Sequence, residues 1–194
     1  MSLARTFQRF RNRNKKIPPT RNKVYFEALE PRLLLSSDLA YTAAAGTAAD
    51  LTLRLQKVDN IDTLQLINNV DQSIVESQAL YDTSAVVITG ADQDDTLRLD
   101  LDFDDLLDSI LINFHGGLGD DTLVGPDTDN LWEITGAGEG KLNSQMSFTD
   151  VENLSGGREA DTFDFDDGAS IAGLLNGGRL GVCSDLPCRG SHAN

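Results

Sequence analysis

The 194-residue chain has only two cysteines and two histidines, and it has no run of about 18 apolar residues that would cross a membrane as a helix. The cysteines and histidines do not form the four-ligand patterns of structural zinc sites. Tryptophan occurs once and proline five times, whereas glycine occurs 17 times. These shortages exclude most catalytic designs based on imidazole or thiolate, and the glycines indicate a chain rich in turns.

Basic residues are scarce after position 32. Residues 1–32 carry nine Lys and Arg against two Glu, a net charge of +7, whereas the remaining 162 residues carry 7 basic and 29 acidic side chains. Of the 31 acids, 24 are Asp, a residue that favours turns and hard-cation sites over helices. The acidic body argues against nucleic acid as a partner, because phosphate binding needs a basic surface.

The N-terminal region predicts an export or targeting segment, largely disordered, over residues 1–49. A basic leader is followed by Leu33-Leu34-Leu35 and then by the small residues 43–49, an order typical of export signals. The basic region is long, however, and polar residues 36–38 interrupt the apolar run. The alternative is a disordered basic arm that touches a membrane or the acidic body.

Leu29-Glu30-Pro31-Arg32, followed by Leu34-Leu35, resembles the LEPR-XLL segment near the N-terminus of very large, repetitive bacterial surface proteins. This resemblance implies an exported, adhesin-like parent, secreted or on the bacterial cell surface, of which this chain would be an N-terminal or truncated piece. It supplies no reaction.

After residue 50, short segments alternate apolar and polar residues, the period of a half-buried strand. The expected strands cover residues 51–55, 63–67, 85–89, 96–103, 110–114, 122–124, 131–135, 146–148 and 162–165. Residues 69–80 are ambiguous and can also be read as a short helical turn. Gly, Asp and Asn separate the segments, so the sequence predicts an all-β body.

The expected strand 96–103 places its apolar side chains on one face and a ladder of carboxylates, Asp100, Asp102 and Asp104, on the other. The ladder is either a solvated outer face or a place where a divalent cation relieves repulsion. The segment lacks the glycine and the distal glutamate of an EF-hand loop.

Three strings that begin at Gly90, Gly116 and Gly156 align without gaps. Each has Gly first, Asp sixth, Thr seventh and a bulky apolar residue eighth. The middle copy fits the nonapeptide G-G-x-G-x-D-x-U-x at every specified position. A fourth start at 176–178 opens similarly and then diverges.

The middle copy resembles the calcium motif of repeats-in-toxin (RTX) proteins. The resemblance implies that Gly117 and Gly119 offer turn carbonyls to Ca²⁺ and that Asp121 offers its carboxylate, with Asp95 and Asp161 as the equivalents in the flanking copies. The copies are 26 and 40 residues apart rather than in tandem, and the flanking copies lack some of the motif's glycines. Plain structural corners are therefore the alternative to a calcium site.

Residues 121–136, 140–143, 148–157 and 161–163 are similar to β-strand repeats of filamentous-haemagglutinin-like surface proteins. This similarity implies a right-handed parallel β-helix or a related β-solenoid over residues 50–178, in which each coil buries its apolar residues by stacking on the next. Trp132 is then expected in the core.

Two functions remain open. The first is a non-enzymatic, calcium-assisted surface or adhesion module with a cell-surface, matrix or glycan partner. The second is a polysaccharide-acting lyase or hydrolase, which would need a basic residue and several carboxylates in one groove. Neighbouring Asp pairs point to opposite faces of a strand, and His115 is expected to be an exposed residue beside a turn, so the sequence favours the non-enzymatic function.

The last 16 residues, 179–194, contain both Cys183 and Cys188 and depart from the repeat pattern. They predict an irregular, non-native tail. A genuine tail with a small disulfide loop is the alternative.

Overall fold

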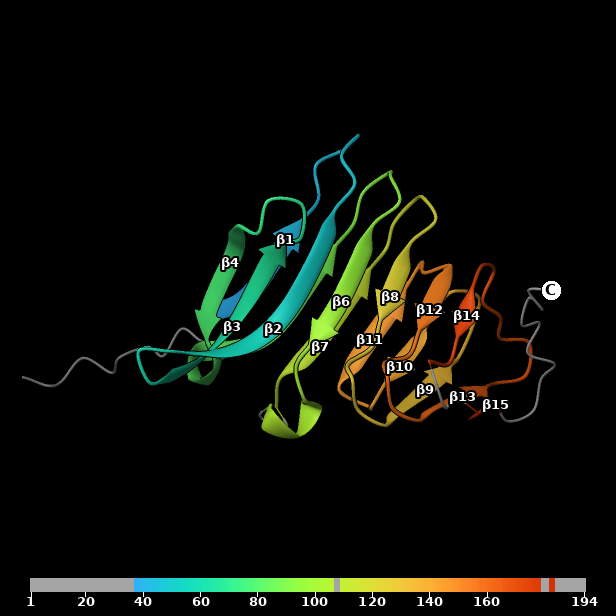
Figure 1. Cartoon of the computed structure of the whole chain (residues 1–194). Coiled ribbons are helices and arrows are strands. Elements are labelled where there is room, and N and C mark those ends of the chain that lie inside the picture. Colours follow the sequence, from blue (N-terminus) through green and yellow to red (C-terminus); the bar gives the residue numbers. More distant parts are fainter. Residues whose placement is uncertain (1–36, 107–108, 179–181, 184–194) are drawn as a thin grey trace, which may run out of the picture. The chain divides into compact units, whose positions relative to one another are not determined.

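The computed structural model describes residues 37–106, 109–178 and 182–183, so residues 1–36 of the expected export segment and most of the tail lie outside the described ranges. The described chain is built almost entirely of strands, with two short 3-10 turns, η1 (Leu80–Asp82) and η2 (Phe103–Asp105) (Figure 1). The strands are β1 (Ser37–Thr42), β2 (Asp50–Val58), β3 (Ile61–Asn68), β4 (Ile74–Ala79), β5 (Thr83–Thr89), β6 (Thr96–Asp100), β7 (Leu111–His115), β8 (Thr122–Val124), β9 (Asn130–Ile134), β10 (Gly140–Leu142), β11 (Met146–Thr149), β12 (Asn153–Ser155), β13 (Asp161–Phe165), β14 (Leu175–Asn176) and β15 (Val182–Cys183). The all-β prediction is confirmed.

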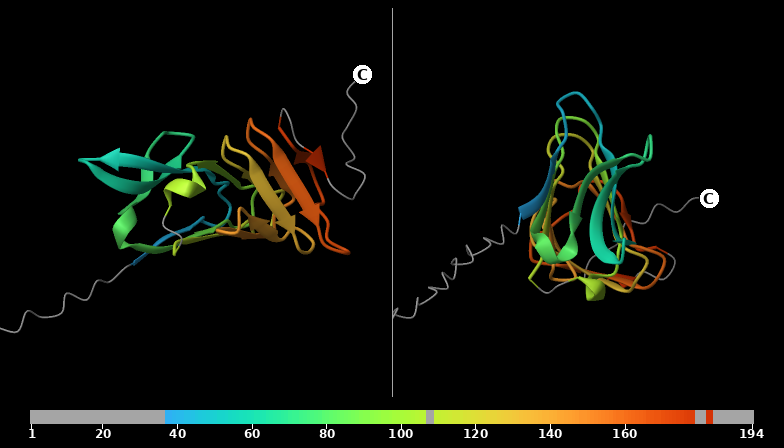
Figure 2. Two further views of the ribbon diagram at one scale, coloured as in Figure 1. Left: turned by 90° about the horizontal axis from the view of Figure 1, so that it is seen from below. Right: turned by 90° about the vertical axis from the view of Figure 1, so that its left-hand side faces the viewer.

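The strands form two mixed sheets. Sheet A has the order β1-β5-β7-β11-β10-β9-β13-β15, and sheet B has the order β14-β12-β8-β6-β2-β3-β4. In five consecutive pairs of strands, β1–β2, β5–β6, β7–β8, β11–β12 and β13–β14, the first strand lies in sheet A and the second in sheet B. Figure 2 shows these pairs following one another from two further directions.

Equivalent strands of successive pairs run parallel wherever they are neighbours in a sheet. In sheet A, β1, β5, β7 and β11 pair in this way, and in sheet B so do β2, β6, β8, β12 and β14. Because neighbouring strands keep the same register, equivalent apolar residues of successive strands form rows across the sheet. One row in sheet B is Leu51, Leu97, Leu123, Leu154 and Leu175.

The core lies between the inner faces of the two sheets. Trp132 is fully buried, stacks on Phe163 with 5.5 Å between ring centroids, and meets Phe148 edge-on at 6.1 Å. Such aromatic pairs stabilise a core beyond their buried area. The prediction that Trp132 is a core residue is confirmed.

Two antiparallel insertions interrupt the parallel pairing. The strands β3 and β4 extend sheet B beyond β2, and β9 and β10 separate β11 from β13 in sheet A. The two-residue turn Asp59-Asn60, between β2 and β3, has positive φ at both residues, which fits a tight hairpin turn. The turn between β10 and β11 has three residues, 143–145, and the first two, Asn143 and Ser144, have positive φ.

The structure changes three expectations about the elements. Strand β1 lies before the predicted boundary at residue 50, and its Leu39 is buried. The ambiguous segment 69–80 contains strand β4 rather than a helical turn, and the 3-10 turn η1 follows it. Within the expected irregular tail, Val182 and Cys183 form β15 and pair with β13.

The predicted carboxylate ladder is wrong as a continuous strand face. Strand β6 ends at Asp100, and Asp102 instead accepts a hydrogen bond from the backbone N–H of Asp104 at the start of η2. An Asp side chain competes for local backbone donors in this way and favours a turn over an extended strand. Leu101 and Phe103 are nevertheless buried, as predicted.

Candidate functional site

Four of the five turns that lead from sheet A to sheet B stack on one another and form what we call the first corner, residues 43–49, 90–95, 116–121 and 150–152. In each of the following cases, a backbone hydrogen bond joins the first residue of one turn to the last strand residue before the next turn. The N–H of Gly90 donates to the carbonyl of His115, and the N–H of Gly116 donates to that of Thr149.

Glycine is required at the start of two of these turns because the neighbouring backbone is too close for a side chain. A Cβ at Gly90 would lie 1.9 Å from the carbonyl oxygen of Gly116, and a Cβ at Gly116 would lie 1.9 Å from that of Asp150. The repeated glycine of the sequence motif therefore serves the close stacking of the turns.

A row of carboxylates links the turns of the first corner. The Asp95 carboxylate accepts from the N–H of Ala49 (2.6 Å), and the Asp121 carboxylate accepts from the N–H of Asp95 (2.7 Å). The Glu152 carboxylate in turn accepts from the N–H of Asp121 (2.9 Å). Each carboxylate thus satisfies a backbone donor of the preceding turn, and such charge-assisted bonds are stronger than neutral ones.

Asp95 and Asp121 are both buried, but they differ at the second carboxylate oxygen. Oδ2 of Asp95 accepts from the N–H of Ala91 (2.8 Å), whereas Oδ2 of Asp121 is buried with no hydrogen-bond partner in the described chain. The pKa of Asp121 is raised to about 6, chiefly by burial and also by the negative charges of Asp95 and Glu152, while the bond from the Asp95 backbone opposes the rise.

Two of the turns that lead from sheet B back to sheet A form what we call the second corner, residues 125–130 and 156–161. Here Asn130 stacks on Asp161 in the parallel pairing of β9 and β13. The Asn130 amide nitrogen lies 2.7 Å from Asp161 Oδ1, 2.7 Å from the Thr128 carbonyl and 3.0 Å from the Pro126 carbonyl. The neutral side-chain amide of Asn130 is therefore surrounded by three oxygen atoms.

Asp161 is buried, and this burial raises its pKa, while the Asn130 amide and the Trp132 indole lower it. The indole N–H and Asp161 Oδ2 nevertheless make no hydrogen bond of ordinary geometry. Asp161 thus has the environment of Asp121 but belongs to a different corner.

The structure brings four of the five predicted site residues together. Gly117 and Gly119 have φ of 108° and 136°, as the motif requires, and lie in the same turn as Asp121, with Asp95 in the neighbouring turn. Asp161 lies in the second corner. Sequence reasoning missed Asn130 and Glu152, although Gly125 and Asn130 repeat the spacing of Gly156 and Asp161 and would have revealed the second corner.

The residues of the first corner offer the hard oxygen donors that Ca²⁺ prefers, including the unpaired Oδ2 of Asp121. The stacked turns are close, because a Cβ at Gly117 or Gly119 would lie 2.5 or 2.6 Å from the carbonyl oxygen of Ala91 or Gln93. Among the described residues, no three His, Cys, Asp or Glu side chains are grouped closely enough to hold a metal ion. The donor chemistry fits a cation, whereas a full coordination shell would require the turns to separate.

The first corner also carries exposed carboxylates, Asp92, Asp94 and Asp120, that accept hydrogen bonds from neighbouring turns. In the described ranges, the ion pairs join Lys57 to Asp62, Arg98 to Asp50 and Arg158 to Asp127. No cation therefore compensates the first corner within the part of the chain that the structure describes.

A groove of about 590 Å³ lies on the outer face of sheet B, between β2, β6, β8 and the turns of the second corner. Arg98 and Arg158 line it together with Asp100, Asp102 and Asp127. His115 lies elsewhere, exposed at the end of β7, where its Nδ1 is 2.5 Å from the Thr149 hydroxyl. The prediction that His115 is an exposed residue beside a turn is confirmed.

Comparisons with protein-family models, with curated proteins and with solved structures find no match for this chain. Within the described ranges, the structure contains no helix of the length and hydrophobicity that a membrane span needs.

Proposed function

We propose that the chain is a structural module of an exported bacterial surface protein, built as a calcium-assisted β-solenoid. The observation that supports this proposal is the alternation of successive strands between two sheets, with equivalent strands parallel and in register. Each pair of strands would then be one coil, and the two corners would be turns that recur in successive coils.

The proposed solenoid gives the carboxylates a structural role. Each Asp or Glu of the first corner connects one coil to the next through a backbone N–H. This arrangement needs no substrate, and it explains why Asp recurs after glycine turns. A divalent cation would add a further link by binding Asp121 and neighbouring oxygens, as the RTX resemblance implies.

The proposed export depends on residues 1–49 and on their LEPR-XLL resemblance. Fusion of residues 1–49 to a periplasmic or surface reporter should carry the reporter out of the cytoplasm in a bacterium that exports related proteins. Replacing Leu33, Leu34 and Leu35 by serine should stop the export. A reporter that stays in the cytoplasm with the unaltered segment would contradict the proposal.

The groove on sheet B favours a second candidate function, a polysaccharide lyase or hydrolase, because it combines two arginines with three carboxylates. Incubation of the full chain with neutral and acidic polysaccharides, followed by measurement of new reducing ends, distinguishes the two functions. The structural module releases none, whereas the enzyme releases them and loses this activity when the groove carboxylates are replaced by amides.

A further inference from the structure

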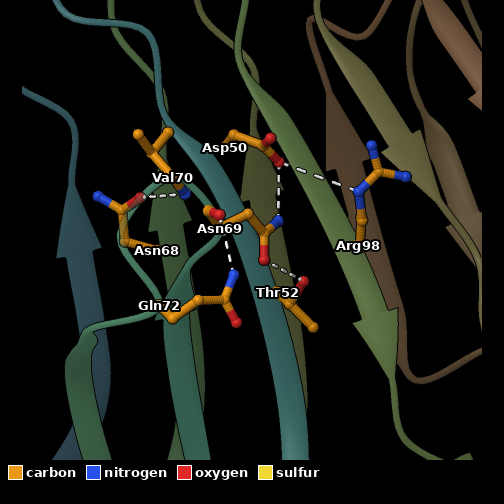
Figure 3. A network of polar contacts seen from close by, with 7 residues as sticks. All are labelled: Asp50, Thr52, Asn68, Asn69, Val70, Gln72 and Arg98. Atoms are coloured by element: carbon orange, nitrogen blue, oxygen red, sulfur yellow. Dashed lines mark hydrogen bonds and ion pairs between the residues drawn. The ribbon is translucent and has the colours of Figure 1, made fainter.

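One end of the groove on sheet B is held in place by a polar network around Asn69 (Figure 3). The Asn69 amide donates to Asp50 (2.7 Å), and the hydroxyl of Thr52, which lines the groove, donates to Asn69 (2.9 Å). Asp50 lies 3.9 Å from Nε of Arg98, so the pair is loose. The two terminal nitrogens of Arg98 point away from Asp50 and stay available to a ligand (Figure 3).

The other cation of the groove, Arg158, lies in the turn of the second corner. Its Nε is 3.4 Å from Asp127, and 80% of its side chain is exposed. The described residues contain five Lys and Arg in all: Arg54, Lys57, Arg98, Lys141 and Arg158. Two of these five therefore line a single groove on a strongly acidic body.

The charges of the groove determine which ligand it can accept. Asp100, Asp102 and Asp127 outnumber the two arginines, so an anionic ligand would meet net repulsion. No aromatic side chain lines the groove, so an apolar ligand would find no large surface to cover. Hydroxyl groups suit it better, because they accept hydrogen bonds from guanidinium groups and donate them to carboxylates.

We propose that this groove binds a neutral polyhydroxylated glycan, with Arg98 and Arg158 donating to its oxygens and the three carboxylates accepting from its hydroxyls. This proposal rests on the proposed surface role of the chain and adds the chemical class of its partner. Its test needs neither export nor calcium, so a failure here leaves the reporter experiment unaffected.

The test is calorimetric titration of the full chain with neutral cello-, xylo-, laminari- and malto-oligosaccharides, and with an oligogalacturonate as the acidic comparator. We expect at least one neutral series to bind and the oligogalacturonate to bind more weakly. Arg98→Gln with Arg158→Gln should weaken neutral binding by about tenfold or more, the effect of losing about 1.4 kcal/mol. Lys141→Gln, which changes an exposed side chain of β10 in sheet A, is the control and should leave binding unchanged.

Melting temperatures of the variants show whether they keep the fold, since both arginines are exposed side chains. Asp127→Asn serves as a second probe of the groove and should also weaken binding. Three results would each overturn the proposal: no binding of any neutral series at millimolar concentration, equal binding by the arginine and lysine variants, or tighter binding of the oligogalacturonate.

Discussion

The two carboxylate oxygens of Asp121 have different environments. Oδ1 fixes the backbone of the preceding turn through Asp95, while Oδ2 is buried without a donor. An ionised carboxylate in this position is costly, because burial and neighbouring negative charges both disfavour the charged form. The stability of the stacked turns should therefore depend on pH through this residue.

The raised pKa of Asp121 predicts a definite pH dependence of stability. The folded chain holds the proton up to a pH of about 6, whereas the unfolded chain releases it near the ordinary value of 3.8. The free energy of unfolding contributed by this residue should therefore fall as the pH rises from about 4 to 6, and change little above that. Urea unfolding at pH 4.5 and pH 7, with a chelator present, measures the effect.

Asp121→Asn cannot titrate and should lose this part of the pH dependence. Asp164→Asn removes an exposed carboxylate from the outer face of β13 and should keep it. If the two variants show the same pH profile as the parent, Asp121 is not the group responsible.

Asn130 lies opposite Asp161 in the second corner, and its buried polar side chain carries no charge. Its amide nitrogen lies within 3.0 Å of three oxygens, including Oδ1 of Asp161, so the second corner has a side-chain donor that the first corner lacks. Oδ2 of Asp161 is nevertheless unpaired, like Oδ2 of Asp121. The cation is proposed for the first corner because the complete RTX-like turn, with Gly117 and Gly119, lies there.

Strands with a regularly alternating buried face were predictable from the sequence. Leu97 and Leu123 lie in register in neighbouring strands and follow the same alternation, so their sequences showed both the strand and its inward face. The antiparallel pairing of the inserted strand β10 was not predictable, since a period of two is the same for parallel and antiparallel pairing.

The sequence also revealed the turn chemistry of the candidate site but not its location. A glycine followed five residues later by Asp builds the same turn at either corner, so the match of Gly156 and Asp161 to Gly116 and Asp121 could not show which sheet comes next. The partner Glu152 lies 31 residues after Asp121 and belongs to a shorter turn, so no repeat pattern pointed to it.

The close stacking of turns predicts that Gly116→Ala destabilises the fold. The new Cβ would lie 1.9 Å from the Asp150 carbonyl oxygen, and the stacked backbones must separate to accept it. We expect a loss of about 2 kcal/mol or more in the free energy of unfolding, in the range of overpacked cores. Chemical denaturation measures it.

Gly168→Ala is the comparison for this prediction. Gly168 has a φ of 85° but no atom near its Cβ position, so the change adds backbone strain without a steric clash. The cost should be about 1 kcal/mol. A larger loss at Gly168 than at Gly116 would mean that close stacking is not what the repeated glycine provides.

For the molecule as a whole, the large negative charge opposes compaction, and salt and a bound cation should relieve it differently. We expect NaCl to raise the melting temperature by screening, and millimolar Ca²⁺ to raise it more than Mg²⁺ at equal ionic strength. Binding to the folded state alone adds about 2.7 kcal/mol when free Ca²⁺ is 100-fold above its dissociation constant. Differential scanning calorimetry measures these shifts.

A comparison of Asp121→Asn with Asp164→Asn distinguishes Ca²⁺ binding at a specific site from general electrostatic screening. Asp121→Asn should reduce the Ca²⁺ response more than Asp164→Asn does, while the NaCl response stays the same in both. Equal losses would show general screening, and no Ca²⁺ response in the parent would leave the turns of the first corner as structural corners alone.

The order of strands in sheet A has a consequence for how the chain folds during synthesis. Along the sheet, β7 is followed by β11, β10 and β9 before β13, so two strands, β11 and β10, separate β9 from β7, the last strand of sheet A made before it. In sheet A, β9 cannot pair with the growing structure until β10 and β11 have been made and have filled the gap. In sheet A, addition of successive strands from the N-terminus should therefore stop at residue 130 and resume when residue 149 is available, when β11 pairs with β7 and β10 and β9 extend the sheet from β11.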